Sequence, residues 1–85
     1  MPDSVNLLSV KINSPDKIIW EGKAEYISSV NSQGPFDILP SHANFITIVE
    51  NKPIKIKSQT DILTYTFTRA VIYNHSNNIL IYTNL

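Results

Sequence analysis

Two histidines, His42 and His75, are the side chains in this sequence best suited to proton transfer near neutral pH. Hydrolytic catalysis also needs a nucleophile beside a base, or two carboxylates in one cleft. The histidines fall in different predicted turns, the chain has no cysteine, and neither histidine has an obvious acidic partner. Asp37 and His42 are too few for a metal site, which needs three or four ligands. The sequence therefore predicts turn or surface histidines, no metal site and no catalysis.

The segment from Gly34 to Ala43, which reads GPFDILPSHA, combines features that rarely occur together. Its two prolines remove backbone donors and fix φ, so it cannot be an ordinary central strand. Its large apolar residues are nevertheless out of place in a solvated loop, and we expect them to fill the core: Phe36, Ile38 and Leu39. We expect a half-buried edge segment that ends in a shaped surface turn, where interaction sites tend to lie. The small or polar residues of this segment predicted to contact a partner are Pro35, Ser41 and His42.

The rest of the chain is organised as short strands that hold such turns in place. Apolar residues alternate with polar ones, as in Ile54-Lys55-Ile56-Lys57, which is typical of half-buried antiparallel strands. Turn residues follow about every ten positions, and this spacing favours a sandwich or barrel. We predict a single all-β domain over 1–85, a flattened antiparallel two-sheet sandwich of eight to ten strands. The expected strands are 5–12, 17–22, 24–31, 35–39, 44–49, 53–58, 61–68, 69–74 and 78–83.

Composition excludes several classes of function. The formal net charge is zero and the seven Lys and Arg residues are dispersed, so nothing indicates binding to nucleic acid or to an anionic membrane. Two glycines are too few for a phosphate-binding loop, and no small-molecule substrate or cofactor is expected. No apolar run approaches the roughly 20 residues that span a bilayer, and no signal peptide is visible. These features predict a soluble, cytoplasmic chain.

Four ordered pieces of the sequence resemble the N-terminal β-sandwich domain of the ATP synthase epsilon subunit. Val10-Lys11-Ile12 with Ser14-Pro15-Asp16-Lys17 resembles the opening of that domain, and Trp20-Glu21-Gly22-Lys23-Ala24 continues it. The segment 34–43 is similar to the signature loop of the family, and Asn78-Ile79-Leu80-Ile81-Tyr82 to its closing strand. The resemblance covers residues 5–84. Many members carry a helical hairpin after this domain, whereas this sequence ends at Leu85, directly after the last expected strand. Either the chain is a naturally short member or the sequence is a shortened one, and in both cases the inhibitory and nucleotide-sensing functions of the hairpin are not transferred to it.

The resemblance implies a non-catalytic subunit of the rotor, or central stalk. In the family this domain docks on the gamma subunit and on the membrane c-ring, so that ion translocation is coupled to ATP synthesis. Membrane association is then expected only through the complex, at the cytoplasmic face of the inner or plasma membrane. The mechanism would be mechanical, with a rigid sandwich stiffening the foot of the stalk.

Several positions depart from the family pattern. Pro35 stands where an acidic residue is often found, which weakens a specific polar contact with the ring. Arg69-Ala70 replaces two glycines, so the local bulge and its contact with gamma are expected to differ. Asp37 and Asn44 replace a glycine and a proline. The complete set of partner-contact candidates is Gly34, Pro35, Phe36, Ser41, His42 and Arg69.

One alternative is a free-standing β-sandwich module that binds protein or carbohydrate. Such a module would expose aromatic residues on one sheet face, with Trp20, Tyr26 and Tyr73 as candidates. Trp20 is itself predicted to lie in the core or at its edge, although an exposed tryptophan could anchor an interface. A small hydrolase built around His42 is the least favoured possibility, because no partner residues are evident.

Overall fold

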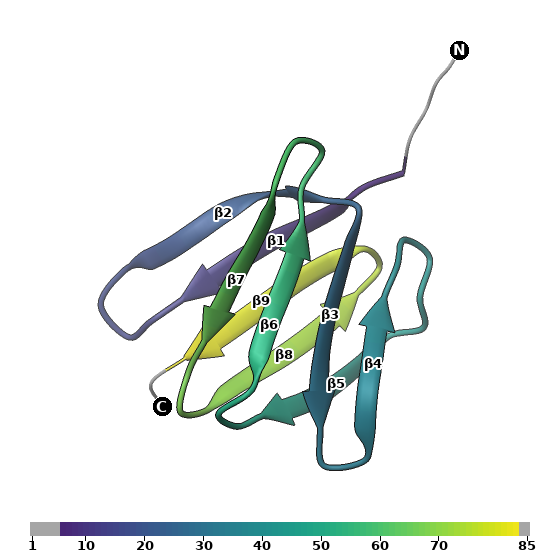
Figure 1. The fold of residues 1–85 in the computed structure, drawn as a ribbon. Coiled ribbons are helices and arrows are strands. Elements are labelled where there is room, and N and C mark those ends of the chain that lie inside the picture. Colours follow the sequence, from purple (N-terminus) through teal and green to yellow (C-terminus); the bar gives the residue numbers. More distant parts are fainter. Residues whose placement is uncertain (1–5, 84–85) are drawn as a thin grey trace.

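The computed structural model describes residues 6–83, which form nine β-strands and no helix (Figure 1). The strands are short, between five and seven residues each. Their bounds are β1 Leu8–Asn13, β2 Ile18–Ala24, β3 Tyr26–Asn31, β4 Gly34–Ile38, β5 Phe45–Val49, β6 Pro53–Lys57, β7 Ile62–Thr66, β8 Ala70–His75 and β9 Asn78–Thr83.

The strands form two sheets that pack face to face (Figure 1). Sheet A has the order β2-β1-β9-β8-β5, and sheet B has the order β4-β3-β6-β7. The molecule measures 41 × 29 × 21 Å, so it is flattened. This architecture confirms the predicted all-β two-sheet sandwich with eight to ten strands.

One strand pairing corrects the prediction of a purely antiparallel sandwich. β1 and β9 lie side by side in parallel, with Val10 opposite Ile79 and Ile12 opposite Ile81. All other pairings among residues 6–83 are antiparallel. Local alternation cannot reveal this arrangement, because both orientations bury the same alternate side chains.

Each predicted strand is present, and most ends agree within two residues. The exception is the first strand, which begins at Leu8 rather than at position 5. Position 5 itself lies outside the described residues.

The core lies between the sheets and contains the apolar side chains that alternate along the strands. Ile54 and Ile56 of β6 are fully buried, whereas Lys55 between them is exposed. Complete burial of such a side chain contributes about 1.5–3 kcal/mol. Trp20 packs against the edge of this core, as predicted, and its ring lies across Gly22. A Cβ atom at position 22 would lie only 2.7 Å from that ring, which explains the glycine there.

Candidate functional site

The first half of the segment 34–43 forms a tight turn and the edge strand β4. The Gln33 N–H donates to Asn31 Oδ1 at 2.8 Å, and Gly34 follows with a φ of 121°, a conformation that favours glycine. Pro35 is exposed on β4, the edge strand of sheet B, which confirms the edge predicted for this segment. Phe36 is half-buried and packs against the core.

The second half forms the loop between β4 and β5. The His42 N–H donates to the Leu39 carbonyl at 3.0 Å and closes a turn. Ser41 has a φ of 69°, and its N–H donates to Asn77 Oδ1 at 2.7 Å. The His42 side chain is exposed and lies against Phe45, with 5.1 Å between ring centroids. His42 therefore projects from a fixed corner.

Asparagine side chains fasten this loop to the turn between β8 and β9. Asn44 Oδ1 accepts from the Ser76 N–H at 2.9 Å, and Asn74 Nδ2 donates to the Ala43 carbonyl at 3.1 Å. Ser76 and Asn77 both have positive φ, with values of 49° and 66°. Three residues in this uncommon conformation are thus held at one end of the molecule by side-chain hydrogen bonds. A proline at position 44 has no side-chain oxygen, so it could not accept the hydrogen bond that Asn44 accepts from Ser76.

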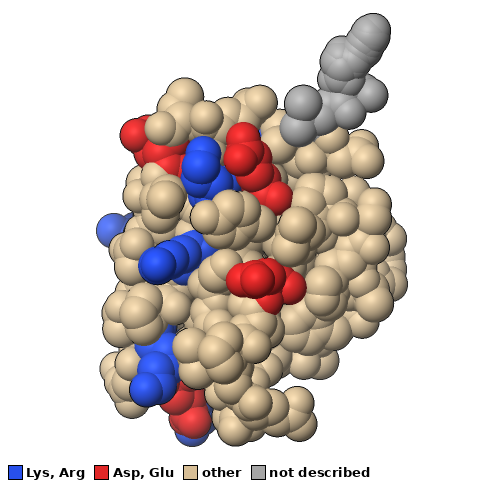
Figure 2. Space-filling model, turned by 45° about the vertical axis from the view of Figure 1, so that its right-hand side comes forward, with Lys and Arg blue, Asp and Glu red and all other residues tan. Residues whose placement is uncertain are grey.

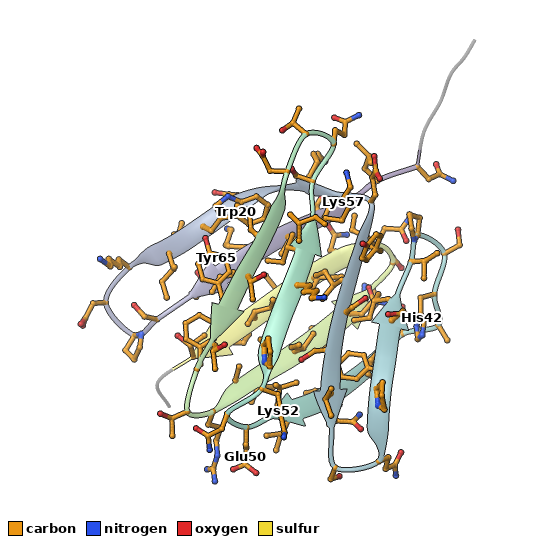
Figure 3. The ribbon with its side chains drawn as sticks, in the orientation of Figure 1. Trp20, His42, Glu50, Lys52, Lys57 and Tyr65 are labelled. Atoms are coloured by element: carbon orange, nitrogen blue, oxygen red, sulfur yellow. The ribbon has the colours of Figure 1, made fainter. Side chains whose placement is uncertain are left out.

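The structure separates five of the six predicted contact residues into two groups at opposite ends of β4. Five residues at about 3.3 Å each place the two ends of the strand roughly 13 Å apart. Figure 3 shows His42 at one side of the molecule and Glu50, the neighbour of Arg69, at the lower end. One end carries Gly34 and Pro35, with Arg69 near the β3–β4 turn, and the other carries Ser41 and His42. Phe36 lies at the middle of the strand, where its ring contacts Phe45. The apolar residues also divide: Ile38 is fully buried as predicted, but Leu39 is 53% exposed and does not fill the core.

Arg69 is exposed and pairs with an acidic residue across two loops. Its Nε and an Nη atom lie 3.2 and 3.1 Å from Glu50 Oε2. Neither Arg69 nor Ala70 has a positive φ, so the backbone here accepts side chains where the family has glycines. The pair lines a surface cleft of about 450 Å³ together with Lys52, Ile48 and residues of the β3–β4 turn.

The outer surface of sheet A carries a feature that the predicted sites did not include. Strand register places Ile46, Tyr73 and Leu80 in one row across three adjacent strands. Ile48, Val71 and Tyr82 form the next row on the same surface. Four of the six are well exposed: Ile46 (65%), Ile48 (53%), Tyr73 (38%) and Tyr82 (40%). These six residues are called the apolar face below.

The apolar face continues into the end that carries Arg69. Ile48 belongs to the apolar face and also lines the cleft beside Arg69, and Ser32 of the β3–β4 turn lies beside Ile46 in an adjoining hollow. Figure 2, which brings the β4 side of the molecule forward, shows charged side chains toward the left of that view and an uncharged surface on the right. Soluble monomers rarely expose large contiguous apolar patches, and such patches mark interaction sites. The arrangement therefore suits docking on another macromolecule.

Among residues 6–83, no group of three His, Asp or Glu side chains is placed to hold a metal ion. The same residues contain no helix long and apolar enough to cross a membrane.

The three aromatic residues named as candidates for a free-standing binding module do not share one sheet face. Trp20 lies on the inner side of β2, where it packs against the core. Tyr26 lies with Ser28 and Asp37 on the outer side of sheet B, and Tyr73 lies on the outer side of sheet A. The three candidates occupy three different surfaces, so together they do not form the platform that this alternative requires.

The sequence contained a signal for the apolar face. The strands that form it read FITIV, AVIYNH and NILIYT, with apolar residues at both odd and even positions. A strand that alternates buries one face, whereas a continuous apolar run indicates cover on both faces. The outer half of these runs has no cover within the sandwich.

Comparison with known proteins gives a consistent family. Residues 7–84 match the profile of the family described as ATP synthase, Delta/Epsilon chain, beta-sandwich domain. The ATP synthase epsilon chain of Gloeothece citriformis is 30% identical over 77 residues, which are 91% of this chain and 56% of that protein. The epsilon chain of Brevibacillus brevis is 28% identical over 54 residues, 64% of this chain and 41% of the relative. The chain thus spans about half the length of these curated relatives.

The fold is also found in a solved structure. A chain in the cryo-EM structure of the Tetrahymena thermophila mitochondrial ATP synthase, central stalk and c-ring, superimposes with a TM-score of 0.77. The two chains are 14% identical, and the match covers 89% of this chain and 62% of the other. At this identity the likeness concerns the fold.

Proposed function

Because the chain belongs to the ATP synthase Delta/Epsilon chain β-sandwich family, we propose that it is a non-catalytic subunit of the central stalk of an ATP synthase. In this role it docks on the gamma subunit and on the membrane c-ring. It then helps to transmit ion-driven rotation of the ring to the catalytic head, where ATP is made. It associates with the membrane, on its cytoplasmic face, only through these partners.

The observation that carries the proposal is the apolar face. Six apolar side chains in two rows give a flat patch on sheet A, and four of them are well exposed. Burial of apolar surface contributes about 25 cal/mol for each Å², so covering this patch would favour association. We assign the apolar face to gamma, with Arg69 and Glu50 at its border.

The two ends of β4 take separate roles in this arrangement. The end with Gly34 and Pro35, which Phe36 follows along the strand, is assigned to the c-ring, because it carries the position where related chains often have an acid. Because Pro35 carries no charge, this contact depends on van der Waals packing. Ser41 and His42, held by the asparagine contacts, form a second contact with gamma at the other end.

Stiffness is the physical requirement for such a subunit. Torque is transmitted only if the sandwich deforms less than its interfaces. Two hydrogen-bonded sheets with a close-packed core meet this need, because protein interiors are as dense as organic crystals. The hydrogen bonds that Asn74 donates and Asn77 accepts extend this order into the loop that carries His42.

Co-purification from native membranes tests the proposal. A tagged chain is expected to recover gamma and c-ring subunits under conditions that keep the synthase intact. Ile46→Asp with Ile48→Asp should abolish recovery of gamma, because two buried charges would have no partners. The control, Lys55→Asp on the outer side of sheet B, makes the same change in net charge and should leave recovery unchanged. Recovery without either partner, from membranes that retain an intact synthase, would contradict the proposal.

A further inference from the structure

The sandwich has four sheet edges, and their sequences differ in a way that bears on binding. β2 and β5 bound sheet A, and β4 and β7 bound sheet B. An edge strand presents unpaired N–H and C=O groups to any extended chain that approaches. Proteins usually prevent such pairing with charges, prolines, bulges or a covering element.

Three of the four edges carry such protection. The pairing of β2 with β1 is irregular at Ile12/Asn13, and Glu21 and Lys23 place charges along β2. β4 contains Pro35, which lacks an N–H, and also an aspartate. β5 has no proline, charge or bulge, but it contacts β3 of the other sheet, and Asn31 Nδ2 donates to Thr47 Oγ1 at 3.0 Å, so this edge is the one that closes the sandwich on its β3 side.

β7 has none of these features. Its five residues, ILTYT, include no proline and no charged side chain. It pairs with β6 in unbroken register from Ile62 to Thr66. Ile62 is 57% exposed, and Thr64 and Thr66 are exposed as well. Within residues 6–83 the edge is therefore regular, neutral and open.

The sandwich also lacks a strand at this edge. Sheet A has five strands and sheet B has four, and Figure 1 shows β2 lying outside β7. The side chains at this open corner are apolar but only partly buried: Trp20 from β2, and Leu63 and Tyr65 from β7. Figure 3 shows Trp20 and Tyr65 on this side of the molecule. A fifth strand in sheet B would satisfy the edge and cover these side chains.

We propose that the β7 edge binds one extended segment of a partner protein, which adds to sheet B as a fifth strand. The segment is uncharged and alternates apolar residues with small polar ones. Its apolar side chains face Trp20 and its polar ones continue the row of Thr64 and Thr66. Main-chain hydrogen bonds supply affinity in this mode, and alternate side chains supply selectivity. A second copy of this chain fits less well, because its own β2 would extend into the same corner.

Intrinsic fluorescence provides a direct test, because Trp20 is the one tryptophan of the chain. The probe is the neutral heptapeptide acetyl-Ser-Thr-Val-Thr-Val-Thr-Ser-amide, added to the 85-residue chain. Its binding should move the Trp20 emission to shorter wavelength and slow amide hydrogen exchange along β7. The control peptide has the same sequence with alternate backbone nitrogens methylated, so it cannot complete the ladder. It should bind at least tenfold more weakly.

A pair of variants separates the edge from the rest of the surface. Thr64→Lys places a charge on the β7 edge and should weaken peptide binding, whereas Gln33→Lys adds the same charge at the β3–β4 turn and should not. Equal binding of the two peptides, or equal effects of the two lysines, would overturn the proposal. So would protection of β7 that rises with the concentration of the chain alone, because a second copy would then occupy the edge.

Discussion

The outer surfaces of the two sheets differ sharply although both sheets enclose the same core. The outer side of sheet A presents Ile46, Ile48 and Tyr73, whereas the outer side of sheet B presents the charged residues Lys55 and Asp37. A sandwich needs only its inner side chains to fold, so the apolar outer surface of sheet A serves another purpose. The difference indicates that one side of the molecule is built to be covered and the other to face water.

The largest expected effect on the free energy of unfolding distinguishes a residue of the core from a residue of the apolar face. Ile72→Ala removes a fully buried side chain of β8 and should cost about 2–5 kcal/mol of unfolding free energy. Ile46→Ala removes the same atoms from an exposed site of the isolated chain and should change stability by less than about 0.5 kcal/mol. Urea unfolding followed by circular dichroism measures both. A similar loss for the two variants would mean that Ile46 supports the fold instead of an interface.

The solubility of the isolated chain should depend on which surface is altered. Ile46→Lys interrupts the apolar face and should raise solubility several-fold, because exposed apolar patches promote association. Thr66→Lys adds the same charge to the outer side of sheet B and should have a much smaller effect. Precipitation by polyethylene glycol gives the comparison. Equal gains from the two lysines would show that net charge, which is formally zero in this chain, controls solubility.

The smallest expected effect concerns the border of the apolar face. Arg69 and Glu50 are more than half exposed, so their ion pair should contribute only about 0.2–1 kcal/mol to the isolated chain. A double-mutant cycle with Arg69→Ala and Glu50→Ala measures this coupling. The same changes should weaken docking on gamma more than they weaken folding. A coupling energy well above this range would mean that the ion pair mainly stabilises the fold and not an interface.

The strands and their bounds were predictable because local pattern determines them. In β6, lysines alternate with buried isoleucines, and the period of two fixes both the strand and its inward side. The turn residues between strands then limit where each strand ends. The parallel neighbours β1 and β9 were not predictable in this way, because they are separated by most of the chain and only the folded sheet order brings them together.

The candidate site was only partly predictable for a related reason. The segment 34–43 stands out by its prolines and histidine, and these are local features. The placement of β4 in sheet B decides that Pro35 and His42 lie at opposite ends of this strand. It also decides that Leu39 is exposed to solvent. The apolar face depends on β5 lying beside the hairpin of β8 and β9, although β6 and β7 separate β5 from that hairpin in the sequence.

Hydroxyl-radical footprinting of tyrosines tests most directly whether sheet A is the covered side. Tyr73 and Tyr82 report on the apolar face, and Tyr26 reports on the outer side of sheet B. On passing from the isolated chain to the assembled synthase, Tyr73 and Tyr82 should become protected while the reactivity of Tyr26 stays the same. Protection of Tyr26 with unchanged reactivity at Tyr73 and Tyr82 would contradict the assignment of the interface to sheet A.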